Sequence, residues 1–197
     1  LNFVDISDAD LDNDTYESAE KQYLQNNIKQ SIPSFKSYIS SFPNGIHALQ
    51  ANFYLAQAYF SEGQEKQSIP NYEYVTAKSR NEFTEQSLAR LAQIYLKTKD
   101  YAKTTEVLKR LETEADYPQN VTYAQSNLMK TYYEQKDYTN AVIYADKVLA
   151  NAKADDKVKA DAQIIVARSA IQTNDEAKAR VSYAKLATIS KGELAAE

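Results

Sequence analysis

The sequence contains no cysteine and no tryptophan, and only three of its 197 residues are glycine. Without cysteine there is no disulfide, no thiolate nucleophile and no thiolate metal site. Three widely separated glycines leave no glycine-rich loop to bind phosphate groups. No apolar run approaches the roughly 18 residues that suggest a membrane-spanning helix, so we expect no transmembrane segment.

Histidine is almost as scarce, because His47 is the only one, and no serine stands in a recognisable nucleophile motif. A Ser-His-Asp catalytic apparatus therefore has no support, and we expect His47 to be solvated in the first turn of a helix. The run Asp8-Ala9-Asp10-Leu11-Asp12 resembles the start of a calcium loop, but Asn13 and Ala19 replace its required glycine and glutamate. We expect a solvated linker there, no metal, no cofactor and no enzymatic activity.

Positive charge is absent from the first 20 residues, which contain seven acidic side chains. The whole chain has a net charge of −4, so the remaining residues carry only about +3. Nucleic-acid binding would require Lys and Arg clustered along one face, and we expect none. Residues 1–14 are predicted to be an acidic leader or linker, and we hypothesise that it occupies part of the binding surface when no partner is bound.

The most informative feature is a repeated segment. LAQAYFSEGQEKQSIPNY begins at Leu55, and related stretches begin at Leu91, Leu128 and Val166, with successive spacings of 36, 37 and 38 residues. A residue that is small in each stretch follows 13 positions after each start: Ser68, Thr104, Ala141 and Ala179. Such a period predicts a solenoid that grows by stacking of units.

Each unit is predicted to be a pair of antiparallel helices. Apolar residues recur at helical spacing, as at Leu88, Leu91 and Tyr95, and short polar turns with Gly, Asn or Asp separate the two halves. Pro33 and Pro70 are expected in first helical turns, where a proline is tolerated. The expected helix pairs are 15–26 and 29–42, 45–61 and 65–78, 82–97 and 100–114, 120–135 and 138–151, and 155–172 and 175–190.

Seven of the 16 tyrosines fit this repeat as packing residues, with an apolar ring and a polar tip. Ala170 stands where the pattern expects a tyrosine. The predicted packing tyrosines are Tyr59, Tyr72, Tyr95, Tyr101, Tyr132, Tyr138 and Tyr183.

The repeated pattern consists of two small residues, a tyrosine, a turn and then Tyr101 or Tyr138. It resembles the tetratricopeptide repeat (TPR). Phe42-Pro43-Asn44-Gly45 and the segment that follows it are similar to the extended repeats of periplasmic and outer-membrane-associated proteins. These include the Tol-Pal coordinator, the lipoprotein of the outer-membrane β-barrel assembly machinery and large multi-repeat envelope proteins. The resemblance implies an all-α, TPR-like α-hairpin solenoid of about five helix pairs in a right-handed superhelix.

The repeat register also predicts the organisation of the chain. We expect residues 191–197 to start a further, truncated repeat, so that the chain is a piece of a longer array. The predicted array spans 15–190, with units at about 15–43, 45–80, 82–117, 119–153 and 155–190.

In the resembled family the first helix of each pair lines a concave surface, which implies a protein or peptide partner there. Aromatic and cationic side chains predict that this partner is acidic or aromatic. The candidate binding residues are Phe53, Tyr54, Gln57, Arg90, Gln93, Lys97, Asn127, Lys130, Tyr133 and Arg168.

The favoured interpretation is a non-catalytic protein-binding scaffold within a larger cell-envelope protein. The resemblance implies a periplasmic or outer-membrane-associated location in a Gram-negative bacterium, and a cytoplasmic location stays open. The alternative is a glycan-binding module of an outer-membrane capture system, in which Phe53, Tyr54, Tyr123 and Tyr133 stack on sugar rings.

Overall fold

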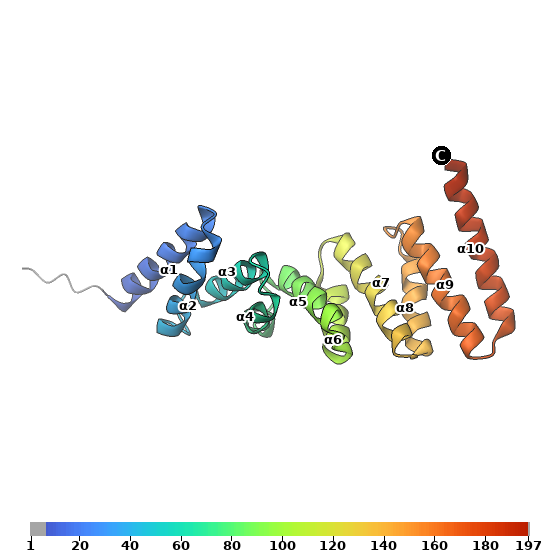
Figure 1. The fold of residues 1–197 in the computed structure, drawn as a ribbon, viewed down its shortest axis with the longest axis horizontal. Coiled ribbons are helices and arrows are strands. Elements are labelled where there is room, and N and C mark those ends of the chain that lie inside the picture. The colour runs from blue at the N-terminus through green and yellow to red at the C-terminus, as the bar shows by residue number, and fades with distance from the viewer. Residues whose placement is uncertain (1–6, 197) are drawn as a thin grey trace, which may run out of the picture. The chain divides into compact units, whose positions relative to one another are not determined.

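The computed structural model describes residues 7–196, with side chains up to residue 189. These residues form ten α-helices and no strand (Figure 1), which confirms the prediction of an all-α repeat protein. The helices are α1 (Asp8–Leu24), α2 (Ile28–Ser41), α3 (Ala48–Ser61), α4 (Glu65–Ala77), α5 (Thr84–Thr98), α6 (Tyr101–Glu114), α7 (Pro118–Glu134), α8 (Tyr138–Ala150), α9 (Asp156–Gln172) and α10 (Glu176–Ala196).

Two expected helix boundaries are wrong. Helix α1 begins at Asp8 and not at 15, because the Ser7 hydroxyl accepts the Asp10 amide and the acidic first turn suits the helix dipole. Helix α10 continues to Ala196 through the segment expected to start a further repeat. One internal glycine, Gly192, costs only about 1 kcal/mol relative to alanine, too little to end that helix. Residues 1–6 of the expected leader and residue 197 lie outside the described residues.

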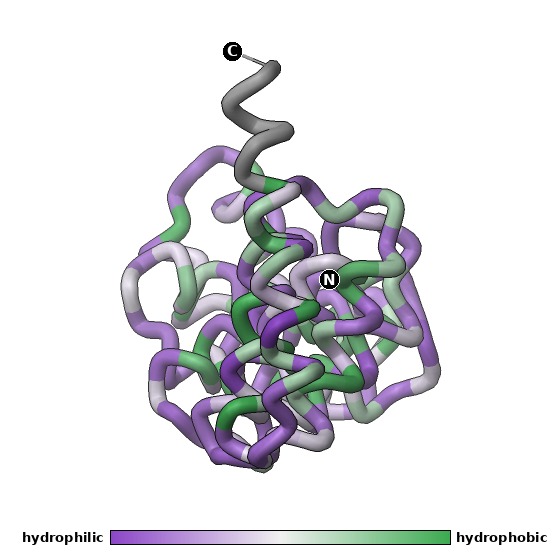
Figure 2. The backbone as a smooth tube through the Cα atoms, turned by 90° about the vertical axis from the view of Figure 1, so that its right-hand side faces the viewer, coloured by the Kyte–Doolittle hydropathy of each residue, from purple (hydrophilic) through white to green (hydrophobic). Residues whose placement is uncertain are grey.

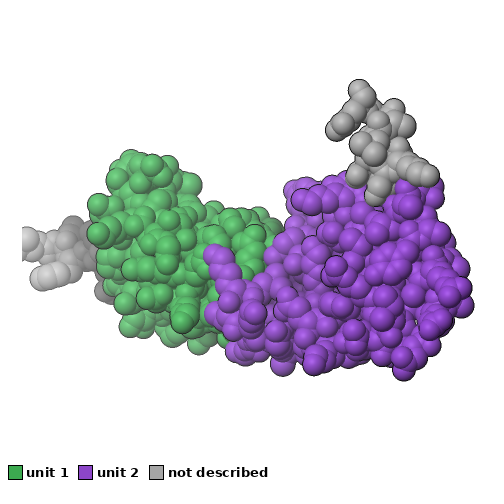
Figure 3. Space-filling model, turned by 45° about the vertical axis from the view of Figure 1, so that its right-hand side comes forward, with its two compact units in different colours: residues 1–94 green, residues 95–197 purple. Residues whose placement is uncertain are grey.

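The chain divides into two compact units, residues 1–94 and 95–197, with the boundary inside α5 (Figure 3). In the first unit α1 contacts α2 and α3, and α3 packs against α4. In the second unit α7 contacts α6, α8 and α9, and α9 packs against α10. First helices of successive hairpins therefore touch each other directly, as α1 touches α3 and α7 touches α9. The right-handed sense of the superhelix stays a prediction.

The turn inside each hairpin has one recurring geometry. Its central residue has a positive φ, 64° at Asn26, 73° at Gly63, 54° at Lys99, 61° at Lys136 and 59° at Asn174. This left-handed residue lets two amides bond back to the preceding helix, as Asp137 N does to Tyr132 O at 2.9 Å. In the last three hairpins the next residue is an aspartate that caps the following helix, as Asp137 accepts the Asn140 amide.

Hydrophobic residues alternate with hydrophilic ones along the helices, with no long apolar run (Figure 2). The residues of the small series are at most 5% exposed, which places them at the close contacts between helices. Tyr72, Tyr95 and Tyr132 are buried as predicted, but the packing role of Tyr183 is wrong, because its side chain is 42% exposed.

The prediction for the two prolines is also wrong. Pro33 is the sixth residue of α2 and Pro70 the sixth of α4, so both lie in the second helical turn. Each removes an amide that would bond to the carbonyl four residues earlier. Both prolines lie on the exposed side of their helix, where water can solvate the freed carbonyl.

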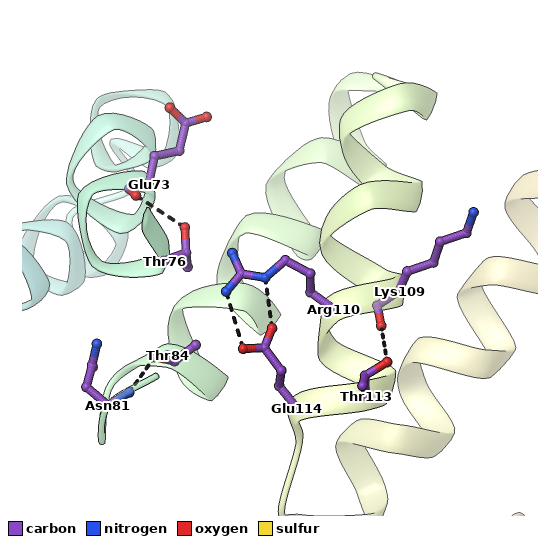
Figure 4. A network of polar contacts seen from close by, with 8 residues as sticks. All are labelled: Glu73, Thr76, Asn81, Thr84, Lys109, Arg110, Thr113 and Glu114. Carbon is purple, nitrogen blue, oxygen red and sulfur yellow. Dashed lines mark hydrogen bonds and ion pairs between the residues drawn. The ribbon is translucent and has the colours of Figure 1, made fainter. Parts of the chain in front are cut away.

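Short polar contacts fix helix ends within each unit (Figure 4). In the first unit the Asn81 amide donates to Thr84 Oγ1 at 2.9 Å, just where α5 begins. In the second unit Arg110 donates twice to the Glu114 carboxylate near the end of α6, from Nε at 2.8 Å and from Nη2 at 3.3 Å. These contacts define helix ends that apolar periodicity alone leaves open.

Candidate functional site

A polar cluster joins the first three helices around the segment that follows Phe42. Tyr38 Oη donates to Asp12 Oδ1 at 2.6 Å and accepts the His47 amide at 3.0 Å, while the Ile46 amide donates to Asp12 Oδ2 at 3.2 Å. Asp12 is only 6% exposed, so the expected solvated linker is wrong at this residue. A buried carboxylate is tolerated because it receives hydrogen bonds from both sides.

His47 is likewise half-buried and not a solvated side chain. Its ring stacks on Tyr16 with 4.2 Å between centroids, and its Nε2 lies 2.7 Å from Asn13 Oδ1. The cluster has an internal partner for each of these polar groups, and we therefore assign it a structural role. Because α1 contributes Asp12, Asn13 and Tyr16, residues 8–14 belong to the first hairpin, and the hypothesis that they form a free leader over the binding surface is wrong.

Four of the candidate binding residues come together on α3 and α5 of the first unit. We call Tyr54, Gln57, Arg90 and Gln93 the α3–α5 surface. All four side chains are partly exposed. The contact between the two helices is aromatic, since Phe53 of α3 stacks on Phe83, just before α5, at 4.4 Å between ring centroids.

Arg90 is the charged centre of this surface. Its guanidinium carbon lies 4.3 Å from the centroid of the Phe60 ring, a cation–π contact, and Nη1 donates to Gln93 Oε1 at 3.2 Å. The buried Nε has no hydrogen-bond partner. Within the part of the chain that the structure describes, no carboxylate pairs with Arg90. An Arg in this state retains donors for an incoming anionic group.

Gln57 and the nearby tyrosines complete the electrostatics. The Tyr72 hydroxyl donates to Gln57 Oε1. Burial raises the pKa of Tyr72 and the Arg90 charge opposes that rise. Burial also raises the pKa of Tyr23, and Arg90 again acts in the opposite direction. Both tyrosines therefore stay neutral beside the guanidinium.

Tyr54 forms the aromatic end of the surface. Its ring centroid lies 5.0 Å from that of Tyr23 and 6.0 Å from that of Phe35. Burial raises its pKa first, and the Glu20 and Glu82 carboxylates raise it further. An acidic group would thus be repelled at this end and attracted at the Arg90 end.

Phe53 does not belong to the exposed surface. Its side chain is 5% exposed and lies between Phe83 and Tyr72, so its expected place on an open groove is wrong. The cause is the packing of α5 onto α3, which the helical period of α3 alone does not reveal. Phe60 was missed, although its i, i+3 spacing from Gln57 puts both on one helix face.

The other candidate residues lie in the second unit and form no single pocket. Lys130 of α7 pairs with Asp161 of α9 at 3.5 Å, and Asn127 Nδ2 donates to a carbonyl of its own helix. Tyr133 packs edge-on against Tyr138 at 5.7 Å. Lys97 and Arg168 are exposed.

Two further properties of the described residues bear on function. No group of three or more His, Asp or Glu side chains there is placed to hold a metal ion. None of the described helices combines the length and apolarity that crossing a membrane demands.

No protein-family model and no curated protein matches the sequence. Solved structures do match. MamA AMB-1 superposes with a TM-score of 0.64 at 15% identity, covering 93% of this chain and 96% of its own. MamA from Desulfovibrio magneticus RS-1 superposes with a TM-score of 0.59 at 13% identity, covering 95% of this chain and 98% of its own. TPR-like repeats of a putative kinesin light chain from Podosopora anserina superpose with a TM-score of 0.53 at 15% identity, covering 92% of this chain and 95% of their own.

The chain has the tetratricopeptide-repeat fold. At these identities the likeness concerns the fold alone, and the similarity extends along nearly the whole chain. In this TPR solenoid the first helices of successive hairpins touch, which brings the Gln57 and Arg90 side chains of α3 and α5 onto one surface.

Proposed function

We propose that the chain is a non-catalytic protein-binding scaffold whose α3–α5 surface binds a peptide segment with acidic and aromatic side chains. The observation that carries this proposal is the state of Arg90. Its guanidinium is held over Phe60, bonded to Gln93 and unpaired with any carboxylate of the described residues. A cation positioned in this way attracts a carboxylate without first having to break an internal ion pair.

The same surface supports the aromatic half of the proposal. Tyr54 presents a partly exposed ring whose neighbours Tyr23 and Phe35 hold it in place. An aromatic side chain of the peptide packs against this ring, while its acidic residue pairs with Arg90, away from Glu20 and Glu82. Aromatic and Arg anchors of this kind supply most of the energy in many interfaces.

The test is selection of binders from a random peptide library against the intact chain. We expect enrichment of peptides that combine Asp or Glu with an aromatic residue. Arg90→Gln should lower the affinity for the selected peptides by about 10-fold to 100-fold, as expected for the loss of a charged hydrogen bond of about 1.5–3 kcal/mol. Arg180→Gln is the matched control, because Arg180 is 84% exposed on α10 and carries the same charge.

Two results would contradict the proposal. One is selection without any acidic or aromatic preference. The other is an equal loss of affinity in the Arg90→Gln and Arg180→Gln variants, which would mean that only net charge matters. Raising the salt concentration should weaken the control and the parent equally, since screening acts on both.

We extend the proposal to the candidate residues of the second unit, which form a contact region of their own for a protein partner. Lys97 and Arg168 are exposed cations, and Lys130 is held by only a partly exposed ion pair, worth about 0–1 kcal/mol. Asn127 and Tyr133 lie on the Lys130 face of α7. Arg168→Gln should then reduce affinity less than Arg90→Gln does, because the Arg168 side chain is more exposed and water screens its charge more strongly.

The glycan-binding alternative makes a different prediction. It needs exposed rings, and the burial of Phe53 removes one of the four proposed for stacking. Tyr54, Tyr123 and Tyr133 are partly exposed and remain available. Binding to a panel of soluble glycans that Tyr54→Ala abolishes, with no peptide selected, would favour the alternative.

We also propose that the chain acts in the cell envelope as part of a longer array of repeats. The support is the resemblance of Phe42-Pro43-Asn44-Gly45 and the following segment to envelope repeats. Fractionation of the native cells tests this placement. Recovery of the protein with the cytoplasmic fraction would contradict it.

A further inference from the structure

A pocket of about 330 Å³ lies among α8, α9 and α10, and none of the candidate binding residues lines it. Apolar walls come from Val142, Ile143 and Ala170, and polar groups come from Ser169, Thr173 and Lys178. Ile143, a large apolar side chain that lines this pocket, is 47% exposed. An apolar cavity of about 150 Å³ already admits benzene, so the pocket has room for an aromatic ring.

The repeat register explains why the pocket exists. Ala170 occupies the position that holds Tyr59, Tyr95 and Tyr132 in the three preceding units. Tyr95 is 4% exposed and Tyr132 8%, so their rings fill the space beside their helices. An alanine leaves that space without a ring.

Lys178 provides an independent sign that an aromatic group fits there. It lies at the same repeat position as Lys103, whose ammonium is 5.4 Å from the centroid of the Tyr95 ring. The pair Lys103 and Tyr95 therefore corresponds to Lys178 and Ala170, with the lysine kept and the ring lost. The ammonium of Lys178 has no partner among the described residues and can lie over an incoming ring.

Ser169 supplies the polar group. Its side chain is 1% exposed, lines the pocket, and has an Oγ without any hydrogen-bond partner. A buried hydroxyl without a partner destabilises the fold unless a ligand forms a hydrogen bond with it.

We propose that this pocket binds a tyrosine side chain of a partner protein. The ring occupies the space left by Ala170, under the ammonium of Lys178, and its hydroxyl pairs with Ser169 Oγ. This site is separate from the α3–α5 surface and does not depend on peptide binding there. In effect, the partner restores the ring that the fifth repeat lacks.

The test uses N-acetyltyrosinamide and N-acetylphenylalaninamide, with binding followed by NMR shifts of the Val142 and Ile143 methyl groups. We expect the tyrosine amide to bind about fivefold more tightly, the value of one neutral hydrogen bond of about 1 kcal/mol. Ser169→Ala should remove this preference. Thr131→Ala is the matched control, because Thr131 holds the same repeat position beside Tyr132.

Filling the pocket gives a second readout. Ala170→Tyr should abolish binding of both amides and raise the unfolding temperature, because the chain then supplies its own ring. Lys178→Gln should weaken the binding of both amides while leaving the fold intact. This variant tests the pocket even if the Ala170→Tyr variant does not fold. Arg90→Gln should change neither affinity, and this separates the pocket from the proposed peptide surface.

The proposal is overturned if neither amide shifts the two methyl groups. It is also overturned if both amides bind equally, or if Ser169→Ala and Thr131→Ala reduce the tyrosine preference to the same extent.

Discussion

The Tyr38 hydroxyl donates a 2.6 Å hydrogen bond to Asp12 Oδ1, joining α2 to α1 across 26 residues of sequence. The same oxygen accepts the His47 amide just before α3, so one phenol connects three helices. Burial, and then the hydrogen bond to Asp12, raise the pKa of Tyr38, which keeps the phenol protonated as a donor. These two hydrogen bonds of Tyr38 attach the first hairpin to the second.

Replacing Tyr38 with phenylalanine should destabilise the first unit. The buried Asp12 carboxylate loses a charged hydrogen bond, which costs about 1.5–3 kcal/mol. Urea unfolding measures the change. Tyr101→Phe is the control, because its 3.2 Å contact with Glu134 is exposed and should contribute little. Equal losses at the two sites would contradict the role of the Tyr38 hydrogen bond.

Gly45→Ala should be more destabilising than Gly63→Ala, although only Gly63 has a positive φ. A Cβ at Gly45 would lie 2.5 Å from both Asp12 Oδ2 and Tyr38 Oη. At Gly63 a Cβ meets nothing, so that substitution costs only the left-handed backbone, about 1–2 kcal/mol. The unfolding temperatures of the two variants are compared. A larger decrease for Gly63→Ala would show that the Asp12 and Tyr38 side chains move aside at little cost.

Lys136→Gly should stabilise the second unit by about 1 kcal/mol. Lys136 holds a left-handed backbone at φ 61° with an exposed side chain, and glycine relieves the steric cost of its Cβ. Chemical denaturation gives the free energy of unfolding. Lys36→Gly, in the interior of α2, should instead lower it by about 1 kcal/mol. A loss at both positions would mean that the turn tolerates lysine without strain.

Stability should fall as the solution becomes alkaline. Burial raises the pKa of Tyr16, Tyr38 and Tyr72 above the ordinary value of about 10. Their contribution is complete below about pH 10 and is lost above it, since the unfolded chain then releases protons that the folded chain retains. Urea midpoints between about pH 8 and about pH 11 follow this loss, which should be smaller in Tyr38→Phe. Midpoints independent of pH would contradict it.

The sequence by itself determined the helix pairs, the turns and the repeat register. These features are local, since a 3.6-residue apolar period and a Gly, Asn or Asp in a turn act within a few neighbouring residues. Lys99 and Lys136 show the strength of this register, because they adopt the left-handed turn conformation of Gly63 without being glycine. The gap at Ala170 was visible in the same way, as a missing member of a periodic series.

Only the tertiary structure decided which side chains meet between helices. The period of α3 puts Phe53 and Tyr54 next to each other, but the packing of Phe83 buries the first and leaves the second partly exposed. Asn13 and His47 meet across 34 residues, and no local pattern joins an acidic N-terminal segment to a lone histidine. The repeat fixes the position of each side chain along its own helix, while burial depends on neighbours that are distant in sequence. For the same reason, only three-dimensional packing decided that the space beside Ala170 stays open as a pocket.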